Sequence, residues 1–181
     1  MTVYVGKGSP VFEFILPQDC MNESNQTIDK WMQGGNEQPI SSNIVGTQTD
    51  TNLPLPLCQS FAVQCCKMIS NLVYNAGGRT YGGLNDGTTD IEFEVRNCWG
   101  ADYAPGDFVK PHNHFPADFA AVGYLRCDDG AAPIIFDGNS PYYPTERQLL
   151  IFDAKMLHEV PVTNAHRRCF AMNLYKKSGT F

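Results

Sequence analysis

The second half of the chain constrains the fold most, because from Asp90 onward nearly all of it has the pattern of short strands. Runs rich in Val, Ile, Leu, Phe and Tyr are separated by Gly, Pro, Asp or Asn, which is typical of strands joined by turns. The expected strands are residues 91–98, 108–112, 119–126, 132–136, 148–152, 158–162 and 167–175. A succession of this kind predicts a jelly-roll sandwich or barrel, in which each sheet buries one face.

The first half is expected to supply helices. Residues 17–33 have helical character, and residues 60–75 carry apolar side chains at helical spacing before Ala76-Gly77-Gly78 ends the pattern. Residues 3–16 read as strand, broken at Gly8-Ser9-Pro10. We therefore predict a mainly β fold with flanking helices, a double-stranded β-helix whose N-terminal helices pack on one sheet. It forms a single domain over residues 1–181, with helical support over roughly 1–89 and the jelly-roll core over roughly 90–176.

The composition excludes several classes of protein. With 43% hydrophobic and 18% charged residues, the chain is typical of a globular protein rather than a disordered one. No apolar run has the length of a membrane span, and the N-terminus lacks the apolar core of a signal peptide, so we expect a cytoplasmic protein. A net charge of -6 disfavours nucleic acid as a partner. Seven cysteines without a Cys-x-x-Cys pair indicate reduced thiols.

Three histidines form a candidate metal site. His112 and His114 lie two residues apart in a segment expected to be strand, so both imidazoles project from one face. His158 opens a later strand and could join them. Imidazole suits Fe, Cu, Ni and Zn, and an oxygen-activating iron needs three protein ligands on one side. A carboxylate such as Asp118 in place of His114 is the alternative, and His166 is expected at the surface.

A candidate anion site lies on the last strand. By strand parity Arg167, Cys169, Ala171 and Asn173 share one face, and the bulky apolar residues of the opposite face should pack on the helices. The first face is small or polar, which leaves a cavity with Arg167 at its rim. A guanidinium there can bind a carboxylate in bidentate fashion. The alternative is that Arg167 forms an ion pair with Glu159 or Asp153.

Several further motifs occur in a fixed order along the second half. These are Tyr103-Ala104-Pro105-Gly106 before His112, then Gly123-Tyr124-Leu125, then the turn and strand at 130–136, and last His158-Glu159-Val160 with Arg167 nine residues on. In this order and spacing the sequence resembles the Fe(II)- and 2-oxoglutarate-dependent oxygenases, closest to the prolyl-hydroxylase-like branch. The resemblance covers roughly residues 91–175.

The resemblance implies an iron-dependent hydroxylase of a peptide side chain or a small molecule. Fe(II) would be the metal, and 2-oxoglutarate the co-substrate, consumed with O2 to give succinate and CO2. Arg167 and Tyr124 would hold the distal carboxylate of 2-oxoglutarate, and we add Tyr103 and Asn173 to the co-substrate residues. Substrate choice is expected in the loops at 34–57, 81–90 and 138–146, of which residues 81–90 form a candidate lid.

One motif departs from the family. Its usual His-x-Asp is here His112-Asn113-His114, so the metal is held either by three histidines, which we favour, or by a triad that Asp118 completes. A cupin-type metal-dependent dioxygenase or isomerase is the main rival, because Gly106, His112, His114 and Asp118 resemble the first cupin motif. A non-catalytic jelly-roll binding protein is the other. A cupin, however, gives no reason for Arg167.

Overall fold

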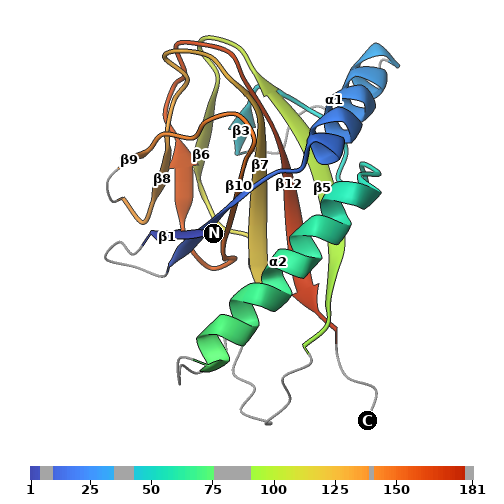
Figure 1. The fold of residues 1–181 in the computed structure, drawn as a ribbon. Coiled ribbons are helices and arrows are strands. Elements are labelled where there is room, and N and C mark those ends of the chain that lie inside the picture. Colours follow the sequence, from blue (N-terminus) through green and yellow to red (C-terminus); the bar gives the residue numbers. More distant parts are fainter. Residues whose placement is uncertain (5–9, 35–42, 76–90, 139–140, 178–181) are drawn as a thin grey trace.

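Two β-sheets pack face to face, and two helices cover the outer face of the larger sheet (Figure 1). The computed structural model describes residues 1–4, 10–34, 43–75, 91–138 and 141–177. The larger sheet has the order β1-β2-β10-β7-β12-β5-β4, and the smaller one β3-β6-β11-β8-β9. Every neighbouring pair of strands is antiparallel.

From β5 onward the chain passes back and forth between the two sheets. In the larger sheet lie β5 (Phe93–Tyr103), β7 (Phe119–Cys127), β10 (Gln148–Asp153) and β12 (Arg167–Lys176). In the smaller sheet lie β6 (Phe108–His112), β8 (Ile134–Phe136), β9 (Pro141–Tyr142) and β11 (His158–Val160). This alternation is that of a double-stranded β-helix, so the predicted fold class is confirmed.

The part of the chain before residue 90 adds more than helices. Two strands, β1 (Thr2–Tyr4) and β2 (Val11–Ile15), extend the larger sheet beside β10. Two shorter ones, β3 (Ile44–Val45) and β4 (Thr47–Gln48), lie at edges of the smaller and the larger sheet. These two fall in the stretch that the sequence marks only as an irregular loop, because a two-residue strand carries no periodicity.

Helix α1 (Gln18–Gln33) agrees with the sequence pattern, but α2 (Pro56–Asn75) begins four residues earlier than predicted. Proline suits the first position of a helix, because its missing N–H is not needed there. The carboxylate of Glu23 on α1 accepts the next two free N–H groups, those of Leu57 and Cys58, each at 3.0 Å. A cap supplied by a distant residue explains why the local apolar pattern placed the start too late.

The larger sheet separates two buried clusters, and β12 contributes to both. Phe170, Met172 and Leu174 pack with the helices, whereas Cys169 and Ala171 face the smaller sheet. The parity predicted for this strand is therefore confirmed. Neither α1 nor α2, within the residues described, is long and apolar enough to cross a membrane.

Candidate metal centre

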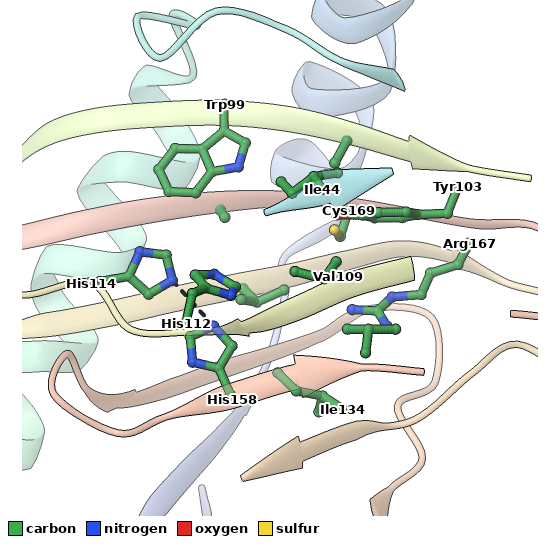
Figure 2. Close-up of a pocket in the computed structure, with 14 residues that line it drawn as sticks. Ile44, Trp99, Tyr103, Val109, His112, His114, Ile134, His158, Arg167 and Cys169 are labelled. Carbon is green, nitrogen blue, oxygen red and sulfur yellow. Dashed lines mark hydrogen bonds between the residues drawn. The ribbon is translucent and has the colours of Figure 1, made fainter. Parts of the chain in front are cut away.

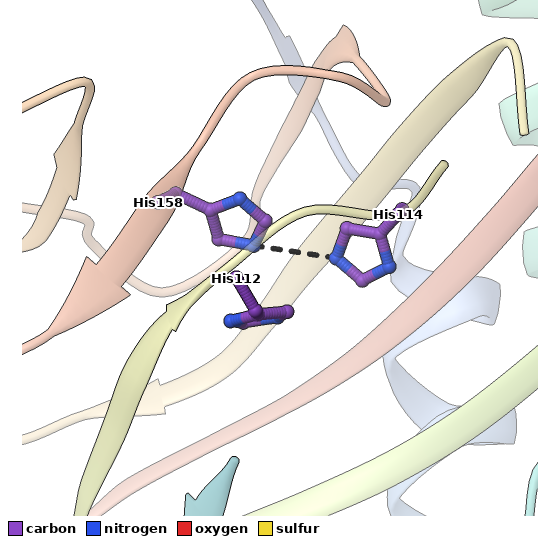
Figure 3. Close-up of side chains that lie close together, drawn as sticks. All are labelled: His112, His114 and His158. Carbon is purple, nitrogen blue, oxygen red and sulfur yellow. Dashed lines mark hydrogen bonds between the residues drawn. The ribbon is translucent and has the colours of Figure 1, made fainter. Parts of the chain in front are cut away.

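Three imidazoles converge between the sheets (Figure 3). His112, His114 and His158 each offer a ring nitrogen, and these atoms all lie within 4.8 Å of one another. The Nε2 atoms of His114 and His158 are 3.2 Å apart. Two nitrogens that bind one ion at about 2.0–2.1 Å are separated by about 3.0–3.4 Å in facial or tetrahedral arrangements, so this spacing fits shared coordination.

Strand pairing brings two of the three together. His112 is the last residue of β6, His158 is the first of β11, and the two face each other across the antiparallel pair. His114 lies beyond the end of β6, so the expectation that it shares a strand with His112 is wrong. Its position comes instead from its main-chain N–H, which donates to the carbonyl of Ala154 at 2.7 Å. That contact turns the chain so that the third ring points at the other two.

Main-chain carbonyls set the tautomers of two of these rings. Nδ1 of His112 lies 2.9 Å from the carbonyl of Lys110, and Nδ1 of His158 lies 3.0 Å from that of Met156. A carbonyl can only accept, so each Nδ1 carries the proton and donates, which leaves the lone pair on Nε2. Fixing the far nitrogen in this way also orients the ring, as is usual for histidine ligands of metals.

Burial keeps the rings neutral. It is the main cause that lowers the pKa of His158 to about 3 and that of His114 to about 4, and the charges of the neighbouring imidazoles add to it. The pKa of His112 is lowered as well, again mainly by burial. A histidine must be unprotonated to bind a metal, so all three are in the ligand form at neutral pH.

No carboxylate joins this cluster within the described part of the chain. Oδ2 of Asp118, the alternative ligand, accepts the main-chain N–H of Lys176 at 2.7 Å. Asp153 is also engaged, since its Oδ1 accepts the N–H of Lys155 at 2.8 Å. His166 is exposed, as expected. The residues brought together are thus three histidines.

A narrow cavity of about 40 Å³ runs from the histidines to Arg167 (Figure 2). Figure 2 shows the guanidinium pointing along the cavity towards the rings, with Val109, Ile134 and Cys169 between them. Arg167 is only 2% exposed. Its guanidinium carbon lies 5.5 Å from the ring centre of Tyr103 and 5.0 Å from that of Tyr124. Both rings therefore present their faces to the cation.

Arg167 has no ion-pair partner among the described residues. Its Nη1 donates to the carbonyl of Ala132 at 3.3 Å, but its buried Nε has no acceptor among the residues that the structure describes. The buried hydroxyl of Tyr124 also has no hydrogen-bond partner in the described part of the chain. The pairing with Glu159 or Asp153 that we considered is not formed. A buried cation without a counter-ion is expensive, so this end of the cavity is complementary to an anion.

A second pocket, of about 310 Å³, opens on the other side of the histidines. His112 and His114 line it together with Trp99, whose ring stacks on His114 with centres 5.7 Å apart. Asn173 lines this pocket and not the cavity of Arg167, so the structure does not bring it together with Tyr103 and Tyr124. Its contact with the co-substrate stays a prediction.

Sequence reasoning singled out none of six side chains that line this second pocket: Asn43, Ile44, Gln48, Thr51, Asn97 and Trp99. The last two share a face of β5 with Tyr103, so strand parity counted back from Tyr103 could have found them. The predicted strand ended at Cys98, so Trp99 and Tyr103 were not assigned to the same strand as Asn97 and their shared face was not recognised. Gln48 had no such signal, because it lies on a two-residue strand.

Solved structures with this architecture identify the fold. A prolyl-4-hydroxylase from Pseudomonas putida superposes with a TM-score of 0.62 at 18% identity, over 95% of both chains. The viral collagen prolyl hydroxylase of Paramecium bursaria Chlorella virus-1, in its 2-oxoglutarate complex, gives 0.60 at 13% identity, over 94% of this chain and 98% of that one. The chain has the fold of a 2-oxoglutarate-Fe(II) oxygenase.

An oxidoreductase of the 2-oxoglutarate-Fe(II) oxygenase family from Burkholderia pseudomallei matches in the same way. Its TM-score is 0.55 at 18% identity, over 92% of this chain and 85% of that one. No protein-family model matches the sequence, and no curated protein does either. The likeness to known proteins is therefore one of fold.

Proposed function

We propose that this protein is an Fe(II)- and 2-oxoglutarate-dependent dioxygenase that hydroxylates a peptide side chain or a small molecule. The observation that carries the proposal is the buried Arg167 guanidinium, which lacks a counter-ion and shares its cavity with three neutral histidines. A ligand that is anionic at one end and binds a metal at the other suits both ends. 2-Oxoglutarate has that chemistry.

Each end of the cavity has a distinct role. Arg167 binds the distal carboxylate, with its free Nε as one donor and the unpaired hydroxyl of Tyr124 as a second. Tyr103 contributes its ring face, which holds the guanidinium in place. Asn173 lies on the same face of β12 as Arg167, six residues further along the strand and at the metal end of the cavity. There its amide would contact the keto-acid group.

The three histidines would hold iron through their Nε2 atoms. The metal, when bound, supplies the activation of O2 that is coupled to decarboxylation of 2-oxoglutarate to succinate and CO2. Three imidazoles bring no negative charge, unlike two histidines and a carboxylate. The dianionic co-substrate compensates, with one carboxylate for the metal and one for Arg167.

The test is succinate formation from 2-oxoglutarate by the iron-loaded protein in air, followed by mass spectrometry. Even without the prime substrate we expect slow turnover that stops when Arg167 is replaced. A metal-dependent protein that never consumes 2-oxoglutarate would favour a cupin-type reaction instead. Tight zinc binding with no response to 2-oxoglutarate would favour a non-catalytic binding protein.

A further inference from the structure

His114 differs from the other two histidines of the cluster in what holds its ring. Nδ1 of His112 and Nδ1 of His158 each donate to the main-chain carbonyl two residues earlier. His114 lies beyond the end of β6, and no main-chain carbonyl of the described residues accepts a hydrogen bond from its ring. Its Nε2 faces Nε2 of His158 at 3.2 Å, so Nδ1 is the nitrogen that needs an acceptor from elsewhere in the chain.

The side chain of Asn173 is placed to supply that acceptor. It makes a hydrogen-bond contact with the ring of His114. Its Nδ2 also donates to Oδ1 of Asn97, its partner across the β5–β12 pair, at 3.4 Å. Because the Asn97 oxygen can only accept, the amide group of Asn173 turns its nitrogen towards Asn97 and its oxygen away from it. Oδ1 is therefore the atom of Asn173 that is left for His114.

Two side chains of the larger sheet orient the ring of His114 in different ways. The Trp99 ring stacks on it, with centres 5.7 Å apart and planes inclined by 30°, and so sets the plane of the imidazole. Oδ1 of Asn173 is buried, and its contact is loose, since it has no partner at ordinary hydrogen-bond geometry within the described residues. A buried acceptor without a donor costs about 1–3 kcal/mol, so rotation of the ring in its own plane onto Oδ1 is favourable.

We propose that Asn173 is the positioning residue of His114: its Oδ1 accepts the proton of Nδ1 and so leaves the lone pair of Nε2 for a metal. All three histidines then donate to neutral oxygens, two of them main-chain carbonyls and one a carboxamide, which adds no negative charge to the site. The second proton on Nδ2 of Asn173 stays available for the co-substrate. The inference rests on the proposed function only in naming iron, because the hydrogen bond serves any ion that three histidines hold.

The direct test is NMR of the isotope-labelled full chain, loaded with Zn(II) as a redox-inert metal. A ring Nδ1–H that an acceptor holds exchanges slowly with water and gives a signal in spectra that correlate ring nitrogens with their protons. We expect such a signal from each of the three histidines. In Asn173→Leu, a change to a side chain of similar size, the signal of His114 should be lost while those of His112 and His158 remain. No His114 signal in the unchanged protein, or its persistence in Asn173→Leu, would overturn the inference.

Metal affinity, measured by competition with a chelator, gives a second readout. Asn173→Leu should weaken Zn(II) binding by about 10- to 100-fold, because His114 loses the acceptor that orients it. Asn173→Asp should retain both the His114 signal and the affinity, since a carboxylate accepts the same proton. Gln48→Leu is the matched control: it removes a carboxamide from the same pocket, but Gln48 pairs with Ala101 and not with Asn97, so affinity should not change. An equal loss in Gln48→Leu, or no recovery in Asn173→Asp, would contradict the positioning role.

Failure of this inference is distinguishable from failure of the proposed function. Binding of 2-oxoglutarate is measured by calorimetry on the same Zn(II)-loaded chain and on Arg167→Met. A His114 signal that depends on Asn173, in a chain that never binds 2-oxoglutarate, would support the positioning role and remove the dioxygenase. Binding of 2-oxoglutarate that requires Arg167, in a chain whose His114 signal is indifferent to Asn173, would do the reverse.

Discussion

Replacing Arg167 with methionine should change stability and ligand binding in opposite directions. The side chains are of similar length, but methionine carries no charge, and it fits a site whose neighbours are Tyr103, Tyr124, Ile134 and Cys169. Because the guanidinium has no counter-ion, its removal relieves a desolvation cost. The ligand-free variant should therefore be more stable than the unchanged protein.

The magnitude follows from the contacts that are lost. Burying the charge costs several kcal/mol. The two ring contacts return about 0.5–2 kcal/mol each, and the hydrogen bond to the carbonyl of Ala132 returns about 1.5 kcal/mol. The free energy of unfolding should rise by about 1–3 kcal/mol, which for a chain of this length raises Tm by about 2–12 °C. Loss of the carboxylate partner should weaken 2-oxoglutarate binding by about 2–5 kcal/mol.

Arg168→Met is the matched control. Arg168 lies on the opposite face of β12 and forms ion pairs with Asp102 at 2.6 Å and with Asp29 at 2.7 Å. Its replacement should lower stability by about 1 kcal/mol and leave 2-oxoglutarate binding unchanged. Urea unfolding gives the first quantity, and anaerobic calorimetry of the Fe(II)-loaded protein gives the second. A destabilised Arg167→Met, or a larger loss of 2-oxoglutarate binding in Arg168→Met, would refute the reasoning.

Three further predictions concern the metal site and the core. His158→Ala should reduce bound iron to a small fraction, measured by elemental analysis, and full occupancy would remove His158 from the ligands. The pKa of His158 is lowered to about 3 in the folded chain, compared with about 6.5 in the unfolded chain. The neutral His158 therefore contributes its full stabilisation of the metal-free protein above pH 6.5, and this contribution is lost as the pH falls. That loss is about 2 kcal/mol at pH 5, and equal urea midpoints at pH 7 and 5 would contradict it. Gly123→Ala places a Cβ 2.1 Å from the Phe170 ring, so thermal unfolding should show a loss of about 1–3 kcal/mol or more, and an unchanged Tm would contradict that packing.

The sequence was sufficient for the features that repeat along the chain. The bounds of β6 were predicted to the residue, and the alternation on β12 correctly placed Arg167 in the cavity and Arg168 outside it. Both follow from a period of two, which any strand imposes. The convergence of His112 and His158 also followed, since each lies at the end of a recognisable strand.

Features that depend on contacts between residues far apart in the chain could not be predicted from the sequence. His114 lies beyond the end of the strand because its N–H donates to the carbonyl of Ala154, forty residues later. No local sequence pattern predicts that hydrogen bond. The early start of α2 depends on Glu23 of another helix. Gln48 reaches the second pocket because β4 adds to the edge of β5, a pairing of two residues with no periodic signal. The candidate lid at 81–90 lies outside the described residues.

The most direct test of the central claim is anaerobic thermal unfolding under three conditions: metal-free, with Fe(II), and with Fe(II) plus 2-oxoglutarate. A ligand at a hundred times its Kd stabilises the folded state by about 2.7 kcal/mol, which here means about 5–11 °C. We expect one rise with the metal and a second with 2-oxoglutarate that requires both Fe(II) and Arg167. A response to Fe(II) with none to 2-oxoglutarate would contradict the account.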